Sequence, residues 1–146
     1  MPGRSAVNSR CLATLAAVLM TGCMAAQPEP PVQLRVLEQG AHCGSEVSGS
    51  RWEPADTGWR LRLSMGQQPT GGYVVELADR DVRRVDGAWE LHVVWREPGP
   101  DELVTQALTA PCLLLDVPWD EPVPLRILDQ HGQDRLVVDT DGAADR

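Results

Sequence analysis

WELHVVWR, residues 89–96, places a large apolar side chain at every second position. These residues are Trp89, Leu91, Val93 and Trp95, with polar or smaller side chains between them. Successive side chains of a β-strand point to opposite faces, so this spacing predicts a strand with one buried and one solvent-facing side. The dipeptide Asp86-Gly87 just before it is a strong signal for a tight hairpin turn.

The same two-residue period recurs on both sides of this stretch, and Gly- or Pro-containing turns separate the runs. The other apolar runs are Val32, Leu34 and Val36; Trp59, Leu61, Leu63 and Met65; Tyr73, Val75 and Leu77; Leu113, Leu115 and Val117; and Leu125, Ile127, Leu136 and Val138. Residues 128–134 link the last two strands as a second hairpin. No segment has a capped helical stripe, and the Pro and Thr neighbours of residues 104–108 favour a strand there over a helix. The sequence predicts an all-β fold, a small antiparallel β-sandwich or barrel.

The first 22 residues have the layout of an export signal. Arg4 and Arg10 precede an apolar run at residues 11–20, which is shorter than the ~20 residues a membrane-spanning helix needs. The segment ending in Gly22-Cys23 resembles the lipobox of bacterial lipoproteins, which implies cleavage before Cys23 and lipid on its sulfur. Cleavage near residues 24–26 is the alternative, and it gives a soluble secreted protein.

These features divide the chain into four parts. We expect a signal peptide at 1–22, a lipid anchor with a stiff Pro-rich linker at 23–31, one all-β domain at 32–138, and a flexible acidic tail at 139–146. The expected location is the bacterial cell envelope, with the protein anchored by lipid. Met24 takes the place of the Asp that retains some lipoproteins at the inner membrane, which favours the outer membrane or a periplasm-facing position.

The charge of the chain limits the classes of partner that it is expected to bind. All 13 basic residues are Arg, against 21 acids and a net charge of −8. Loss of residues 1–22 removes two Arg and no acid, leaving 11 Arg against 21 acids and a charge of −10. An acidic domain without a basic patch repels phosphate backbones, so nucleic acid is disfavoured as a partner. Membrane association is expected through the lipid on Cys23 and not through the surface of the domain.

Four cysteines are present, and two of them remain in the expected domain. Cys11 leaves with the signal and Cys23 carries the lipid. Cys43 and Cys112 are then an even pair in an oxidising compartment, which predicts a disulfide. A metal pair and a redox pair are the alternatives, but only His42 lies nearby as a further ligand, and there is no Cys-x-x-Cys motif.

The chain contains no recognisable catalytic constellation, so no catalytic residue, metal site or cofactor is predicted. The three histidines His42, His92 and His131 have no metal-ligand spacing, and no Gly-x-Ser-x-Gly motif is present. The carboxylates cluster in segments that are expected to be loops. Trp52 and Trp119 are also expected in loops beside Pro54 and Pro118, where they cap the end of a sandwich or line a sugar- or peptide-binding surface.

The most specific segment is Gln68-Pro69-Thr70-Gly71-Gly72-Tyr73, which holds the only Tyr of a chain without Phe. Pro fixes φ for a turn, and the two Gly permit positive φ. One interpretation is a rigid connection whose Tyr packs into the core. The other is a loop that displays Pro69, Thr70, Gly71, Gly72 and Tyr73 to a partner, with little entropy lost on binding.

The region from Trp59 to Pro118 resembles the PrcB C-terminal domain family. The features that carry the resemblance are the Pro69–Tyr73 motif, the Pro98-Gly99 turn and Thr109-Ala110-Pro111-Cys112 before a Leu-rich strand. The family is named for a lipoprotein subunit of a bacterial surface protease complex. The resemblance implies a non-catalytic role in binding or stabilising a protein partner such as a protease.

Two other functions are left open by the sequence. The same motif is similar to the Asn-Pro-Thr-Thr-Gly loop of chagasin-type cysteine-protease inhibitors, although Gln68 and Gly71 depart from that pattern and the second signature of those inhibitors is missing. The last possibility is a structural lipoprotein without a dedicated partner.

Overall fold

The computed structural model describes residues 30–140, and within that range the chain forms ten strands and no helix. No segment of this range is therefore a helix long and apolar enough to cross a membrane. The signal peptide, Cys23, most of the linker and residues 141–146 of the expected tail lie outside the described residues. The strands are β1 (Val32–Gln33), β2 (Arg35–Gly40), β3 (Ser48–Pro54), β4 (Trp59–Met65), β5 (Val74–Leu77), β6 (Asp81–Val85), β7 (Ala88–Arg96), β8 (Cys112–Val117), β9 (Leu125–Leu128) and β10 (Asp134–Val138).

The longest strand, β7, is the centre of a six-stranded sheet. Five of its strands follow the order β1-β6-β7-β9-β10, and the sixth, β5, also pairs with β7. β6 pairs with the first half of β7 and β5 with its second half, so both strands share one edge of β7. Asp86 and Gly87 form the β6–β7 turn with φ of 50° and 87°, as the hairpin signal predicts. The β9–β10 hairpin is also confirmed.

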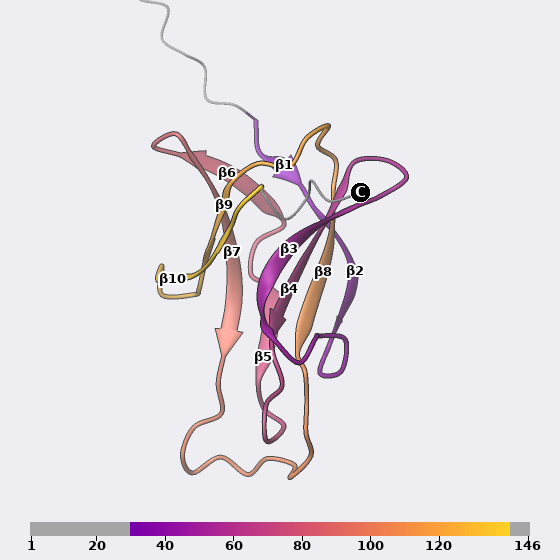
Figure 1. Ribbon diagram of the computed structural model, residues 1–146. Helices are drawn as coiled ribbons and strands as arrows, with labels where there is room; N and C mark the ends of the chain where they lie inside the picture. Colours follow the sequence, from indigo (N-terminus) through magenta and orange to yellow (C-terminus); the bar gives the residue numbers. More distant parts are fainter. Residues whose placement is uncertain (1–29, 141–146) are drawn as a thin grey trace, which may run out of the picture.

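The second sheet has four strands in the order β2-β8-β4-β3, and every pair in it is antiparallel. It faces the six-stranded sheet as the other layer of a sandwich (Figure 1). The chain passes from one sheet to the other at Leu34, which is buried between β1 and β2 and donates its N–H to the carbonyl of Arg80. The core between the sheets contains the alternating apolar residues of β4, β7 and β8.

Cys43 and Cys112 form a disulfide with a Cα–Cα distance of 5.3 Å, as predicted. It joins the loop after β2 to the first residue of β8. On the chain-entropy model, closing a loop of about 70 residues contributes roughly 4 kcal/mol to stability.

The structure corrects four of the sequence-based expectations. The predicted all-β sandwich is confirmed and its barrel alternative is excluded, but the sandwich is not wholly antiparallel, because β7 and β9 run parallel. Trp52 lies in β3 and not in a loop, and only 2% of its surface is exposed. Residues 104–108 form neither a strand nor a helix. Val36, expected on the buried side of a strand, is 38% exposed on β2.

Trp119 fills the gap between Trp52 and Trp89, with ring centroids 5.7 Å and 5.2 Å away. The three rings close one end of the sandwich. This supports the capping interpretation of Trp52 and Trp119 and leaves little of Trp52 to form a binding surface. β1 and the β6–β7 turn lie at this same end, and the loops around residues 70 and 100 lie at the opposite end (Figure 1).

Candidate protein-binding surface

The Pro69–Tyr73 motif lies between β4 and β5, at the end of the sandwich away from β1 (Figure 1). It is held by the long connection between β7 and β8. Gln68 and Thr109 exchange both backbone hydrogen bonds, with N···O distances of 2.7 and 3.0 Å. The Thr109 hydroxyl donates to the carbonyl of Thr70 at 2.8 Å. The Gly71 N–H donates to the carbonyl of Thr105 at 2.9 Å. The two segments therefore form one unit, which we call the paired loops: residues 66–73 and 97–110.

The two glycines of the motif are needed for this pairing. Gly72 has φ of 87°, a conformation that L side chains rarely adopt, and a Cβ there would lie 2.8 Å from Cγ1 of Val104. A Cβ on Gly71 would lie 2.3 Å from the hydroxyl of Thr105. The absence of side chains thus lets residues 98–105 of the same chain lie against the motif.

Arg96, at the end of β7, connects both loops. It donates to the carbonyl of Gly72 at 3.1 Å and forms an ion pair with Glu102. The Gly99 N–H, followed by the Arg96 guanidinium, holds the pKa of Glu102 below its ordinary value. Glu102 also donates its own N–H to the carbonyl of Gly99, which closes a turn at the tip of the long connection.

The connection leaves two apolar side chains in solvent after this turn. Leu103 is completely exposed and Leu108 is 63% exposed. Single exposed apolar residues are common on protein surfaces, but two leucines on a loop fixed by this many hydrogen bonds form a rigid apolar projection. Such a projection loses little entropy when it is buried by a partner.

The residues predicted to contact a partner differ in how far they are exposed to solvent. Pro69 is exposed, Thr70 and Tyr73 are half-buried, and Gly71 is buried. Tyr73 packs against the core cluster. The motif therefore supports the neighbouring loop through its glycines and reaches solvent mainly through Pro69.

Sequence reasoning missed Leu103 and Leu108. The sequence favours a strand at residues 104–108, and a strand buries alternate residues. The sequence around Leu103 does indicate an exposed loop, because a Pro-Gly-Pro-Asp-Glu run precedes it and no two-residue apolar period includes it.

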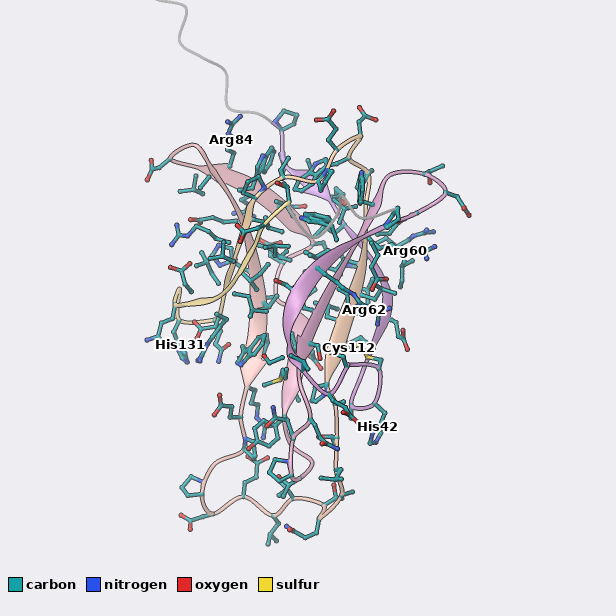
Figure 2. All side chains as sticks on the ribbon, viewed as in Figure 1. His42, Arg60, Arg62, Arg84, Cys112 and His131 are labelled. Atoms are coloured by element: carbon teal, nitrogen blue, oxygen red, sulfur yellow. A yellow bond between two sulfur atoms is a disulfide. The ribbon has the colours of Figure 1, made fainter. Side chains whose placement is uncertain are left out.

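The histidines do not come together. His42 lies in the loop after β2, His92 on the outer face of β7 and His131 in the β9–β10 turn, with His42 and His131 on opposite sides of the molecule (Figure 2). Within residues 30–140, no three His, Cys, Asp or Glu side chains are grouped so that they could hold a metal ion.

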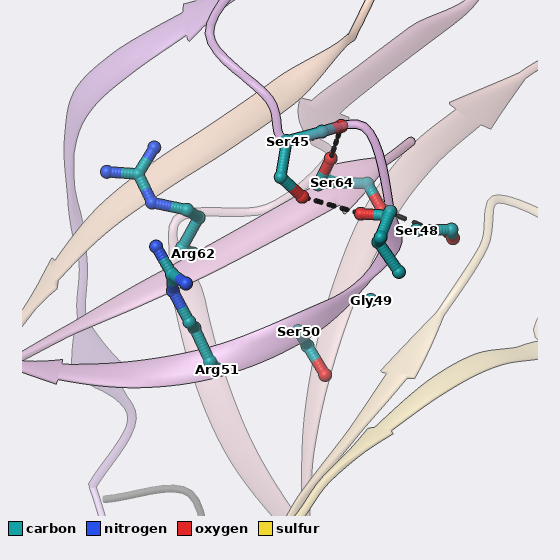
Figure 3. Close-up of a pocket in the computed structure, with 8 residues that line it drawn as sticks. Ser45, Ser48, Gly49, Ser50, Arg51, Arg62 and Ser64 are labelled. Atoms are coloured by element: carbon teal, nitrogen blue, oxygen red, sulfur yellow. Dashed lines mark hydrogen bonds between the residues drawn. The ribbon is translucent and has the colours of Figure 1, made fainter. Parts of the chain in front are cut away.

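A polar hollow of about 200 Å³ lies on the outer face of the four-stranded sheet, beside β3 (Figure 3). The Ser45 hydroxyl donates to the carbonyl of Val47 at 2.6 Å, and the Ser64 hydroxyl donates to the carbonyl of Ser45 at 3.3 Å. Arg51 and Arg62 both bind Glu53, at 2.8 and 2.7 Å. These groups are therefore engaged in holding the loop that carries the disulfide and in joining β3 to β4.

Burial raises the pKa of Glu53, but the hydrogen bonds from Arg62 and then Arg51 outweigh it and lower the pKa overall. The shared carboxylate also separates two like charges that lie directly opposite each other on β3 and β4.

The fold and the surface define a disulfide-bonded β-sandwich with a rigid loop projection at one end. Residues 61–118 match the family model described as PrcB C-terminal. The family resemblance predicted from the Pro69–Tyr73 motif is therefore confirmed over the segment from β4 to the end of β8, which includes both paired loops. Comparison with curated proteins and with solved structures found no match to this chain.

Proposed function

We propose that the protein is a non-catalytic lipoprotein of the bacterial envelope whose domain binds another protein through the paired loops. A surface protease is the partner class we propose, as an enzyme that this domain stabilises or assists. The PrcB C-terminal match supports a role related to a protease complex. The observation that carries the proposal is the rigid exposure of Leu103 and Leu108 on loops clamped by the family motif.

The position of the paired loops is consistent with this role. β1, where the described chain begins, lies at one end of the sandwich, and the paired loops lie at the other (Figure 1). A lipid on Cys23 with a stiff linker then holds the loops on the side away from the membrane, where an envelope partner can reach them.

The test is an affinity pull-down from the native envelope with mass spectrometry of the retained proteins. We expect the wild-type protein to retain a specific protein, with a protease or its pro-form as the proposed identity. The double variant Leu103→Asp, Leu108→Asp should lose it, whereas Val137→Asp, at a residue 59% exposed on β10, should keep it. Equal retention by all three proteins would remove the paired loops as the binding surface.

Inhibition of a cysteine protease is the second candidate, supported by the exposure of Pro69 at one end of a two-sheet sandwich. This function predicts that the purified protein slows a papain-like protease at micromolar concentration or below. A panel of such enzymes that all run at full rate would eliminate it.

A further inference from the structure

The two sheets expose unpaired strand edges on one side of the sandwich. β2 is an edge of the four-stranded sheet, and β5 lies beside it at the edge of the six-stranded sheet. β2 pairs only with β8 among the described strands, and every residue of β2 is exposed. An open strand edge presents N–H and C=O groups that can pair with another extended chain.

A groove of about 180 Å³ runs between these edges. Its walls are residues 39–41, at the end of β2, and residues 73–76, which include most of β5. Tyr73 of the family motif lies at one end of the groove. The groove thus continues from the paired loops along the open side of the sandwich, so one partner can contact both.

The features that normally protect a strand edge are absent from this part of β2. A register shift between Val36 and Glu38 interrupts the first half of the strand, but the pairing of residues 38–40 with β8 is regular. Residues 39–41 are Gln, Gly and Ala, without a charge or a proline. A Cβ on Gly40 would meet no atom within 4 Å, so the space beside it is open.

The opposite side of the sandwich differs. There β3 and β10 lie beside each other, and charged residues lie along both strands. Arg51 and Glu53 are on β3, and Asp134 and Arg135 are on β10. Charges along an edge discourage the addition of another strand, so the uncharged end of β2, at residues 39–41, is the more receptive of the two edges.

Charge indicates what the groove accepts. Glu76 of β5 lines the groove, and it forms no ion pair or side-chain hydrogen bond within residues 30–140. Glu38 of β2 lies outside this lining, in the same cross-strand row as Arg62 on the four-stranded sheet. Arg35 and Arg96, the nearby arginines of β2 and β7, already pair with Asp116 and Glu102. The lining is therefore uncharged apart from the acidic Glu76, in a chain whose net charge is −8.

We propose that an extended segment of a protein partner adds as a strand at residues 39–41, where β2 ends, with uncharged residues at its centre and an Arg or Lys opposite Glu76. Main-chain pairing supplies affinity, and the groove beside Tyr73 and the Glu76 carboxylate supply selectivity. This inference rests on the proposed function, because it assigns a second contact to the same protein partner.

The test uses the full-length protein, purified in mild detergent, against a displayed library of random twelve-residue peptides. We expect enriched peptides with alternating β-branched or aromatic residues and a basic residue at one flank. A synthetic copy of the best peptide should slow amide hydrogen exchange at residues 39–41. Gly40→Lys should weaken its binding at least tenfold, whereas Gly40→Ala and the opposite-edge control Val137→Lys should change it less than twofold.

Other results overturn the inference. These are a library with no enriched peptide, binding that is indifferent to Gly40→Lys, or slowed exchange confined to residues 97–110. The last of these would leave the paired loops as the binding surface and the proposed function intact. Slowed exchange at β2 without peptide, together with a dimer in sedimentation velocity, would assign the edge to a second copy of the chain. The pull-down with the Leu103 and Leu108 double variant tests the paired loops, and the peptide experiment tests the β2 edge. The proposed function and this inference can therefore fail independently.

Discussion

At the scale of single residues, Asp129 organises the β9–β10 turn. Its side chain is fully buried, and one oxygen accepts the N–H groups of His131 at 2.8 Å and Gln133 at 3.0 Å. The other oxygen binds Arg135 at 2.8 Å. The Gln133 N–H first, and then the His131 N–H and Arg135, hold the pKa of Asp129 below its ordinary value although burial raises it.

Because the pKa of Asp129 is lowered, the stability of the fold depends on pH in the acid range. Because the folded pKa lies below the unfolded value of about 3.9, ionised Asp129 stabilises the fold above that pH, and the stabilisation is lost as pH falls through the folded pKa. We expect Asp129→Asn to lower the melting temperature at pH 7 and to flatten its fall below about pH 4. Thermal melts from pH 2 to 7 measure this, with Glu121→Gln in an exposed loop as the control. Identical acid profiles for Asp129→Asn and wild type would contradict it.

Gly72 is the residue on which the paired loops depend. Gly72→Ala combines an unfavourable positive φ with close approaches to Val104 and Pro98, so we expect it to cost about 1–3 kcal/mol. Gly99→Ala is the matched control, because its Cβ would meet nothing and its φ is not positive. Urea unfolding gives the free energies, and hydrogen exchange at the Gly71 amide reports whether the loops separate. A Gly72→Ala protein as stable as Gly99→Ala would show that the loops are not held as described.

At the scale of elements, the strands with a clear two-residue period are those that the sequence predicts. β4, β7 and β8 bury their alternating apolar residues except Trp59 and Trp89, which are half-buried, and the strands span the predicted apolar runs. β3 has no such period. Its sequence, SGSRWEP, contains one large apolar residue, and it forms a strand because residues 48–54 pair with β4. That stabilisation comes from a partner strand, which the local sequence does not encode.

The exposure of the loop at residues 97–110 and of the β2 edge could not be predicted from the apolar pattern of the sequence, for a related reason. Val36 continues an apolar period that begins at Val32, yet the chain changes sheets at Leu34 and turns Val36 toward solvent. Leu103 and Leu108 are apolar like any core residue, and only the structure shows that they are exposed to solvent, on a connection that is hydrogen-bonded to residues 68–71. The Pro69–Tyr73 motif was recognised from the sequence, but its role as the support for another loop required the structure.

The disulfide is the element-scale link that was predicted, and its removal should be measurable. We expect Cys43→Ser with Cys112→Ser to cost roughly 4 kcal/mol, since the bond closes a loop of about 70 residues. For a domain of about 100 residues this corresponds to a fall of roughly 15–30 °C in melting temperature. Calorimetry of the double variant beside wild type, with and without reductant, checks it. Reductant should lower the melting temperature of wild type alone, and an equal effect on both proteins would contradict the assignment.

At the scale of the whole molecule, the expected lipid anchor and the position of the paired loops predict how the domain is oriented relative to the membrane. The described chain starts at one end of the sandwich, next to β1, and the paired loops occupy the other (Figure 1). Cys23 lies nine residues before Val32, and the segment between them contains Gln27-Pro28-Glu29-Pro30-Pro31, which favours a stiff, extended linker. We propose that an anchor at Cys23 holds the β1 end toward the membrane and the loops away from it.

Cys23→Ser tests this arrangement. Each buried acyl methylene contributes about 0.8 kcal/mol, so chains on Cys23 should hold the protein on membranes even in high salt, where the acidic domain itself has no attraction to anionic lipid. We expect wild type to incorporate labelled palmitate and to sediment with membranes, and Cys23→Ser to lose the label and the sedimentation. Cys11→Ser is the control, because Cys11 lies within the expected signal peptide and its loss should change neither property. A Cys23→Ser protein that still sediments in high salt would show that something other than this lipid attaches the domain, and the loops would then need no fixed orientation to reach their partner.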